Sequence, residues 1–314
     1  MKFLDFERDH VESAKLIAVE NYYEEREYVP ILPGIDVLPD LEYFACNGLG
    51  VAAFEGDRLI GFLCCYEPWD NAFGSSAKGT FSPIHAHGAV KENRRLIYQK
   101  MYQAAAEKWV KRNITYHAVA HYAHDTESIN AFFTYGFGLR CMDAIRPMAE
   151  FECQPCDGIY FEELPKTDVI RVRQMRQMES EHMGNSPCFM YSSSENFKSW
   201  LAHAEERTSR LFVANNGEKL IAFVEVKSNG ENFVTESDNM CNICGAFCLP
   251  EFRGKDIYQN LLNFTILKLK TEGYKILGVD FESFNPTGYG FWLKYFTAYT
   301  NSVVRRIDEC ALHD

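Results

Sequence analysis

A basic turn between an apolar stretch and an amphipathic helix is the segment of this chain best suited to chemistry. Residues 245–249 are apolar and strand-like, and after a Pro-Glu turn the chain reads Arg253-Gly254-Lys255 at the start of a helical segment. Backbone N–H groups at a helix start have no partner within the helix and lie at the positive end of its dipole. With the charges of Arg253 and Lys255 they predict a site for a pyrophosphate group. The alternative is an ordinary capped helix with a solvated basic turn.

This segment lies in the second of two similar halves. Residues 51–62 reappear as 212–223, at an offset of 161. Farther along, Asp125 opens a helical segment in the first half as Asn285 does in the second, 160 residues later. An offset that holds within one residue over this length indicates two copies of one domain rather than a single large fold.

The two halves also share an order of elements. In the first half we predict strands at 2–6, 51–54, 59–65, 116–122 and from Gly138 to about 148, and helices at 9–27, 38–47, 93–112 and 125–135. In the second half we predict strands at 159–164, 211–214, 220–226, 241–249, 276–284 and 302–307, and helices at 167–182, 194–206, 256–271 and 287–296. This order predicts an α/β fold in each half, with a mixed, mostly antiparallel sheet and helices on both faces. We place the domains at 1–150 and 158–314, on either side of a Pro- and Cys-containing stretch.

The basic turn resembles the phosphate loop of the GNAT superfamily of N-acyltransferases. That loop reads Arg or Gln, two residues, Gly, one residue, Gly or Ala. Arg253 and Gly254 match its common Arg-Gly start, whereas Asp256 and Tyr258 stand where the family has small residues. The resemblance covers both halves in element order, so it implies two tandem GNAT-like domains.

The resemblance implies a binding site for acetyl-coenzyme A (acetyl-CoA), used as co-substrate, in the second half. The family also has an Asn after its fifth strand, followed by a small residue and an aromatic pair, and Asn285, Gly288 and Phe291-Trp292 are similar to these. The residues expected to bind the cofactor are Phe247, Cys248, Leu249, Arg253, Gly254, Lys255, Asp256, Ile257, Tyr258, Asn285 and Trp292.

The first half departs further from the family. Its corresponding loop keeps Arg94 and Arg95 but has no glycine at the phosphate approach, so the backbone is hindered from coming close to a pyrophosphate. Asp125 stands where the family has Asn, and Phe132 replaces a tyrosine that protonates the departing thiolate in many members. We interpret the first half as a structural or substrate-shaping copy and the second as the cofactor copy.

The implied reaction is direct attack of a primary amine on a thioester. An alkylammonium with a pKa of about 10.4 must lose a proton near neutral pH, at a cost of roughly 4 to 5 kcal/mol. Glu282 is the candidate base, with a solvated or ion-paired carboxylate as the alternative, and Tyr289 and Tyr295 are candidate acids because Trp292 replaces the family's tyrosine. The N–H groups of residues 245–249 would hold the thioester oxygen.

The charge and the hydrophobic pattern limit the classes of partner and the cellular location that we expect. A net charge of −12 disfavours nucleic acid or an anionic membrane as the main partner, and leaves a small-molecule or peptide amine as the expected substrate. The first ten residues have none of the apolar core of a signal peptide, and no stretch is long enough to span a bilayer, so we expect a cytoplasmic protein.

Four other interpretations are open. Cys153 and Cys156, like Cys241 and Cys244, have metal-knuckle spacing, and a second metal reading rests on His85, His87, His117, His121 and His124. We expect no metal, with reduced thiols and satisfied core histidines instead. The rivals to catalysis are an idle GNAT-like ligand-binding or regulatory protein, motivated by Asp256 and Tyr258, and a structural interaction module with Phe291-Trp292 as its partner surface.

Overall fold

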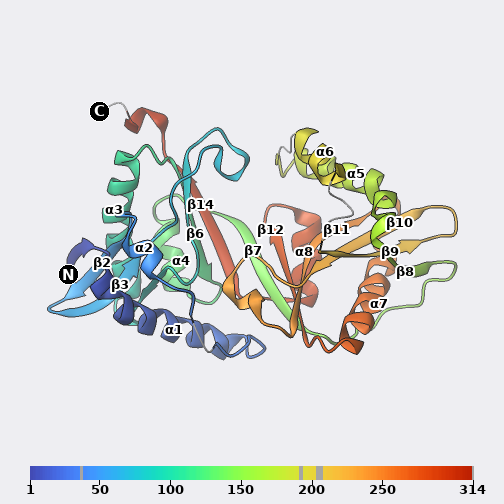
Figure 1. Ribbon diagram of the computed structural model, residues 1–314, viewed down its shortest axis with the longest axis horizontal. Helices are drawn as coiled ribbons and strands as arrows, with labels where there is room; N and C mark the ends of the chain where they lie inside the picture. The colour runs from blue at the N-terminus through green and yellow to red at the C-terminus, as the bar shows by residue number, and fades with distance from the viewer. Residues whose placement is uncertain (36–37, 191–193, 203–207, 313–314) are drawn as a thin grey trace. The chain divides into compact units, whose positions relative to one another are not determined.

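The computed structural model describes residues 1–35, 38–190, 194–202 and 208–312. The chain forms two compact units, one of Met1–Asp143 with Thr297–Asp314 and the other of Ala144–Phe296 (Figure 1). These units differ from the predicted domains, 1–150 and 158–314, because the end of the chain belongs to the first unit.

The first unit contains two groups of strands. One sheet has the order β1-β2-β3-β5 and consists of β1 (Lys2–Asp5), β2 (Val51–Glu55), β3 (Arg58–Leu63) and β5 (His87–Ala89), all antiparallel. In the other group, β4 (Gly79–Ser82) lies parallel to β6 (Tyr116–Tyr122), and β14 (Thr300–Arg306) lies between β6 and β7 (Gly138–Pro147). The short β13 (Thr297–Ala298) also pairs with β7.

Helices cover these strands. They are α1 (Val11–Tyr28), α2 (Glu42–Ala45), α3 (Arg94–Lys111) and α4 (Thr126–Phe133). Buried α3 residues at helical spacing, including Ile97, Met101 and Ala105, pack with the buried side chains of β2 and β3. The apolar residues whose spacing predicted this helix therefore form part of the core of the unit.

The last strand of the chain completes the first unit. β14 is antiparallel to β6, with Thr300 opposite Tyr122 and Arg306 opposite Tyr116, and it is antiparallel to β7 on its other edge (Figure 1). Every residue of β6 is buried, so an unpaired edge would leave backbone groups without water or a partner. β4 covers one edge of β6 and β14 covers the other.

The second unit repeats the layout around a mixed sheet. Its strands are β8 (Tyr160–Leu164), β9 (Arg210–Asn215), β10 (Leu220–Lys227), β11 (Met240–Cys248) and β12 (Ile276–Glu282), in the order β12-β11-β10-β9-β8. β11 and β12 are parallel, and the pairs from β8 to β11 are antiparallel. The helices are α5 (Arg173–Gly184), α6 (Ser194–Ala202), α7 (Ile257–Thr271) and α8 (Pro286–Tyr295). Residues 203–206, the predicted end of the helix at 194–206, lie outside the described residues.

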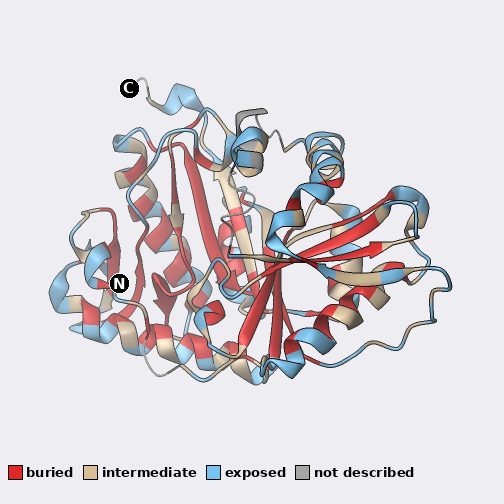
Figure 2. Ribbon diagram, turned by 45° about the vertical axis from the view of Figure 1, so that its right-hand side comes forward, coloured by how far each residue is buried: buried red, intermediate tan, exposed pale blue. Residues whose placement is uncertain are grey.

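Burial confirms the mixed α/β architecture with helices on both faces. Ile221 to Val226 of β10 are all buried, the pattern of a strand covered on both faces (Figure 2). α7 packs on β9 and β10, and α5 packs on β11. No helix among the described residues is both long and apolar enough to cross a membrane.

Candidate active site

The two parallel strands of the second unit separate along their length, and a pocket lies beside the freed part of β11. β11 pairs with β12 only from Met240 to Ile243, although both strands continue beyond that point. The register of β11 against β10 shifts at Cys244, which is the extra residue of a β-bulge. A bulge bends its strand, so the second part of β11 turns away from β12.

Backbone groups of this freed edge face the pocket. The Ala246 N–H donates to Glu179 Oε1 at 3.4 Å, and Cys248 O accepts from Arg253 Nε at 2.9 Å. Leu249 N–H instead donates to Ile221 O of β10. Because successive residues of a strand point their backbone groups to opposite edges, the Cys248 N–H lies on the pocket side.

The predicted phosphate turn forms a bend at the start of α7. Gly254 has φ +71° with open space where a side chain would begin, and Asp256 has φ +55° immediately before the first helical residue. The sequence predicted that Asp256 replaces a small residue. The structure shows that it keeps a left-handed conformation, which Asp and Asn adopt more readily than other side chains. Asn93, at the start of α3 in the first unit, does the same with φ +56°.

The Asp256 carboxylate is held in place at this bend. Its Oδ1 accepts from Gln259 Nε2 at 3.1 Å, and its Oδ2 accepts from the Gln154 N–H at 3.3 Å. The side chain makes no capping bond to the backbone of α7. The N–H groups of the first turn are therefore not satisfied by this carboxylate, although its charge lies beside them.

Tyr258 lines the pocket and carries a buried hydroxyl group. Its ring packs edge-on against Phe291 and Trp292, with centroids 5.2 and 6.1 Å apart. The Tyr258 hydroxyl is buried and has no hydrogen-bond partner among the described residues. Burial raises its pKa well above the ordinary value of about 10, so it stays protonated and can donate.

Asn285 begins α8 on the opposite side of the pocket. Its Oδ1 accepts from the Gly288 N–H at 3.4 Å, as Asp125 accepts from the Ser128 N–H at 3.1 Å in the first unit. His182 Nε2 lies 3.3 Å from the same Asn285 oxygen. The predicted opening of a helix by Asp125 and by Asn285 is confirmed in both units.

The pocket has a volume of about 370 Å³. The predicted cofactor residues that line it are Phe247, Cys248, Arg253, Gly254, Tyr258, Asn285 and Trp292. The other four do not: Leu249 and Ile257 are buried, Lys255 is exposed with Nζ 5.7 Å from the Phe252 ring centroid, and Asp256 is half-buried.

None of the three predicted catalytic side chains is among those that line this pocket. Glu282 ends β12 half-buried, Tyr289 is exposed, and the Tyr295 hydroxyl accepts from Gln259 Nε2 at 3.3 Å. Their catalytic roles stay predictions.

Sequence reasoning missed the contribution of α5. Glu179, His182 and Met183 line the pocket, and their spacing places them on one face of that helix. Glu179 Oε2 also accepts from Arg176 Nη1 at 2.8 Å. The spacing is visible in the sequence, but it does not indicate which face of the helix borders a cleft.

The equivalent place in the first unit is a smaller pocket, whose lining includes Asn21, Arg94 and Asp125. Asn21 binds both backbone groups of Ala89, at 3.1 Å each, and Ala89 pairs with Gly61 as Cys248 pairs with Ala222 in the second unit. The buried Arg94 pairs with Glu24 and Asp125. These contacts agree with the interpretation of the first half as a copy without a cofactor site, which stays a prediction.

The cysteines and histidines considered for metal binding have other partners. Asn263 Nδ2 donates to Cys153 Sγ and Asn260 Nδ2 to Cys156 Sγ. His117 is buried between the Tyr102 hydroxyl and Ile114 O, and burial lowers its pKa to about 4. Across the described residues, no group of three or more His, Cys, Asp or Glu side chains is placed to hold a metal ion.

Residues 172–296 match the acetyltransferase (GNAT) family, and the match ends at Phe296, where the second unit also ends. The second unit belongs to the GNAT family. No curated protein matches the chain.

Solved structures share the fold of this chain across nearly its whole length. A GCN5-related N-acetyltransferase from Sphaerobacter thermophilus is 12% identical with a TM-score of 0.58, over 97% of this chain and 95% of that one. A GCN5-related glucosamine N-acetyltransferase region of a fungal multi-domain GH3 beta-N-acetylglucosaminidase is 12% identical with a TM-score of 0.53, over 96% and 38%. At such identities the likeness shows the fold, and the chemistry must be argued from the site.

Proposed function

We propose that the second unit is an N-acyltransferase that uses acetyl-CoA to acylate a primary amine, either a small molecule or a peptide. The observation that carries this proposal is the pocket beside the freed part of β11, which is lined by Arg253 and Gly254 of the bend and by Tyr258 and Gln259 of the first turn of α7. In this GNAT-family unit, backbone N–H groups of β11 and of the first turn of α7 lie near the Arg253 cation and the apolar side chains of Phe247, Phe291 and Trp292.

The residues at the bend fit a pyrophosphate group. Arg253 and Lys255 supply positive charge, and Gly254 leaves the backbone open to approach. The unpaired N–H groups at the start of α7 add donors at the positive end of the helix dipole. The Asp256 charge opposes binding without blocking these amides. We therefore expect acetyl-CoA to bind more weakly than it would at the same bend without the Asp256 charge.

Bound acetyl-CoA would supply an acyl group activated as a thioester. The Cys248 N–H, on the pocket edge of β11, is placed to stabilise negative charge on a carbonyl oxygen. The Tyr258 hydroxyl is a donor suited to a departing sulfur, and Tyr258 is the tyrosine among the pocket-lining residues. It thus takes the part that the sequence assigned to Tyr289 or Tyr295.

His182 is the pocket side chain best placed to accept a proton from the amine. Imidazole suits proton transfer near neutral pH, and Asn285 and Thr287 hold this ring at 3.3 and 3.4 Å. The Glu179 carboxylate already accepts hydrogen bonds from Arg176 and from the Ala246 N–H. We therefore place the base at His182 rather than at Glu282.

Calorimetric titration with acetyl-CoA tests this proposal. We expect Arg253→Glu to weaken binding by at least about tenfold, because it reverses a charge that assists phosphate binding. Arg253→Gln, which keeps a donor for Cys248 O, should lose less. Lys270→Glu makes the same charge change at the exposed end of α7 and should bind as the parent does. Equal heats for Arg253→Glu and the parent would remove this pocket from consideration.

A catalytically idle ligand-binding protein is the second candidate. It is favoured by the Asp256 charge at the bend and by Trp292 at the place of the family's tyrosine. Measurement of free thiol release from acetyl-CoA over a broad panel of amines separates the two. Binding without any release would favour the idle protein.

A further inference from the structure

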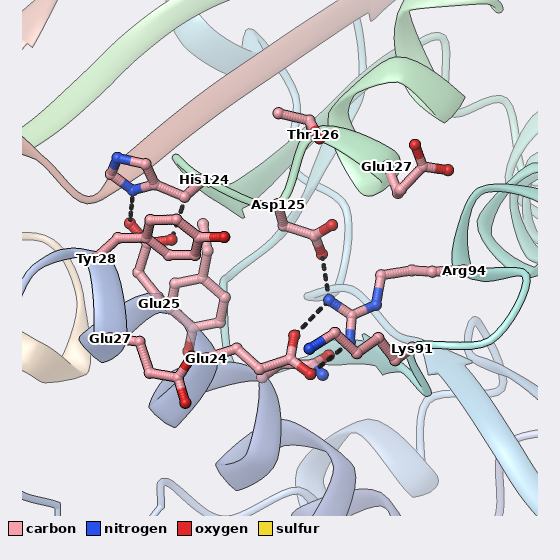
Figure 3. Close-up of a pocket in the computed structure, with 12 residues that line it drawn as sticks. Glu24, Glu25, Glu27, Tyr28, Lys91, Arg94, His124, Asp125, Thr126 and Glu127 are labelled. Atoms are coloured by element: carbon pink, nitrogen blue, oxygen red, sulfur yellow. Dashed lines mark hydrogen bonds and ion pairs between the residues drawn. The ribbon is translucent and has the colours of Figure 1, made fainter.

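The first unit contains a second, strongly acidic pocket that the proposed acyl transfer does not use. It has a volume of about 160 Å³ and lies between α1, the start of α3 and the start of α4 (Figure 3). Five carboxylates and two cationic side chains line it: Glu24, Glu25, Glu27, Asp125 and Glu127, with Lys91 and Arg94.

Part of this charge is neutralised within the unit. Arg94 donates to both oxygens of Glu24, at 2.6 and 3.0 Å, and its Nη1 lies 3.4 Å from Asp125 Oδ2 (Figure 3). One cation between two carboxylates leaves this group negative. Glu25 is bonded to His124, and Glu27 and Glu127 have Lys91 as a neighbouring cation in the pocket. Acidic side chains still outnumber basic ones, so the pocket as a whole repels anions and attracts cations.

A residue that lines the pocket has a buried hydroxyl without a partner, and this points to a ligand. Tyr122 lines the pocket at 5% exposure, and its hydroxyl has no hydrogen-bond partner among the described residues. An unsatisfied buried hydroxyl costs roughly 1 to 3 kcal/mol, so its retention here calls for a partner. The hydroxyl oxygen can accept a hydrogen bond from an N–H donor.

The deepest carboxylate is also ready to accept more donors. Glu25 is 2% exposed, with Oε1 2.8 Å from His124 Nδ1 and Oε2 3.0 Å from the His124 N–H. Each carboxylate oxygen can accept a second hydrogen bond. The Tyr28 ring stacks flat on His124, with centroids 4.7 Å apart, and gives the pocket an aromatic side wall (Figure 3). Tyr28 is exposed, so this wall is open to solvent.

We propose that this pocket in the first unit binds a small aliphatic primary amine in its ammonium form. The ammonium group donates to Glu25 and to the Tyr122 hydroxyl, and the aliphatic part lies against Tyr28. Glu27 and Glu127 are both exposed and suit a second ammonium, which makes a short diamine the best probe. No covalent step is involved.

Calorimetric titration of the full chain with 1,4-diaminobutane dihydrochloride, at ionic strength matched with sodium chloride, tests this proposal. We expect saturable binding, and no saturable binding of acetate or of the uncharged 1,4-butanediol. Tyr122→Phe should weaken diamine binding roughly three- to tenfold, the effect of one lost hydrogen bond. Glu27→Gln, at the exposed rim, should weaken it as well, whereas Glu20→Gln makes the same charge change on an exposed part of α1 and should bind normally.

Thermal unfolding without ligand gives a second readout. Because the Tyr122 hydroxyl has no partner in the free protein, Tyr122→Phe should leave the melting temperature unchanged or raise it. A clear fall would show that the hydroxyl has an internal partner and would overturn the proposal. Equal diamine binding by Tyr122→Phe and the parent, or equal loss in Glu20→Gln, would overturn it too.

Discussion

Asp256→Asn should tighten acetyl-CoA binding without harming the fold. Asp256 lies at the bend before α7 with φ +55°, and its carboxylate accepts hydrogen bonds from Gln259 and from the Gln154 N–H. Asparagine removes the charge, keeps one acceptor oxygen and tolerates the same left-handed conformation. The first unit has this residue at its own bend, where Asn93 has φ +56°.

The expected gain follows from the charge that is removed. A carboxylate about 6 Å from a phosphate repels it by roughly 0.7 to 3 kcal/mol, for effective dielectric constants of about 80 to 20. The bend is half-exposed and screened by salt, so the lower part of this range applies. We therefore expect acetyl-CoA to bind about three- to tenfold more tightly.

Calorimetric titration of three variants at one ionic strength is the assay. Glu218→Gln, in the exposed β9–β10 turn, makes the same charge change away from the bend and should bind as the parent does. Asp256→Ala also removes the charge but should lose roughly 1 to 2 kcal/mol of stability, because alanine resists the left-handed conformation. If Asp256→Asn binds acetyl-CoA no more tightly than the parent, no phosphate approaches this bend and the reasoning fails.

Three further outcomes follow from the structure. Gly245→Ala should destabilise the chain by roughly 1 to 3 kcal/mol in urea unfolding, because its Cβ would lie 2.6 Å from the Arg176 guanidinium; an unchanged midpoint would contradict this packing. Tyr258→Phe should keep acetyl-CoA affinity within about twofold but lower kcat roughly 10- to 100-fold, and an unchanged kcat would exclude the hydroxyl as a donor. Burial lowers the pKa of His117 from 6.5 to about 4. Its neutral side chain therefore contributes roughly 3 kcal/mol to the free energy of unfolding above pH 6.5, and this contribution is lost as the pH falls towards 4. Replacing it with Gln should flatten the pH dependence of the unfolding free energy in that window, and an equal slope would show that His117 is not buried neutral.

The internal repeat and the hydrophobic periodicity were enough to predict the mixed α/β architecture and most of its elements, although not the short strands β4 and β5. They could not predict where β14 pairs, because residues 300–306 would fit the edge of either sheet. The buried strand β6 needs a partner on both edges, and this need becomes visible only when the strands are assembled. The C-terminal strand therefore completes the first unit rather than the second.

The site was predictable where local chemistry defines it. The bend at Arg253 and Gly254 and the helix start at Asn285 follow from residues close together in the sequence. The roles of Glu179 and His182 do not, because α5 meets β11 and α8 only through the tertiary fold. Likewise, Arg94 has the charge that a phosphate site needs, but its ion pair with Glu24 could not be predicted, because Glu24 lies on a separate helix.

A crystal structure of the full chain with coenzyme A tests the central claim most directly. The account predicts that the diphosphate lies within hydrogen-bonding distance of backbone N–H groups between Gly254 and Tyr258, with the thiol end directed to the Cys248 N–H. Coenzyme A bound elsewhere, or the Tyr258 ring filling the space in front of those amides, would contradict it.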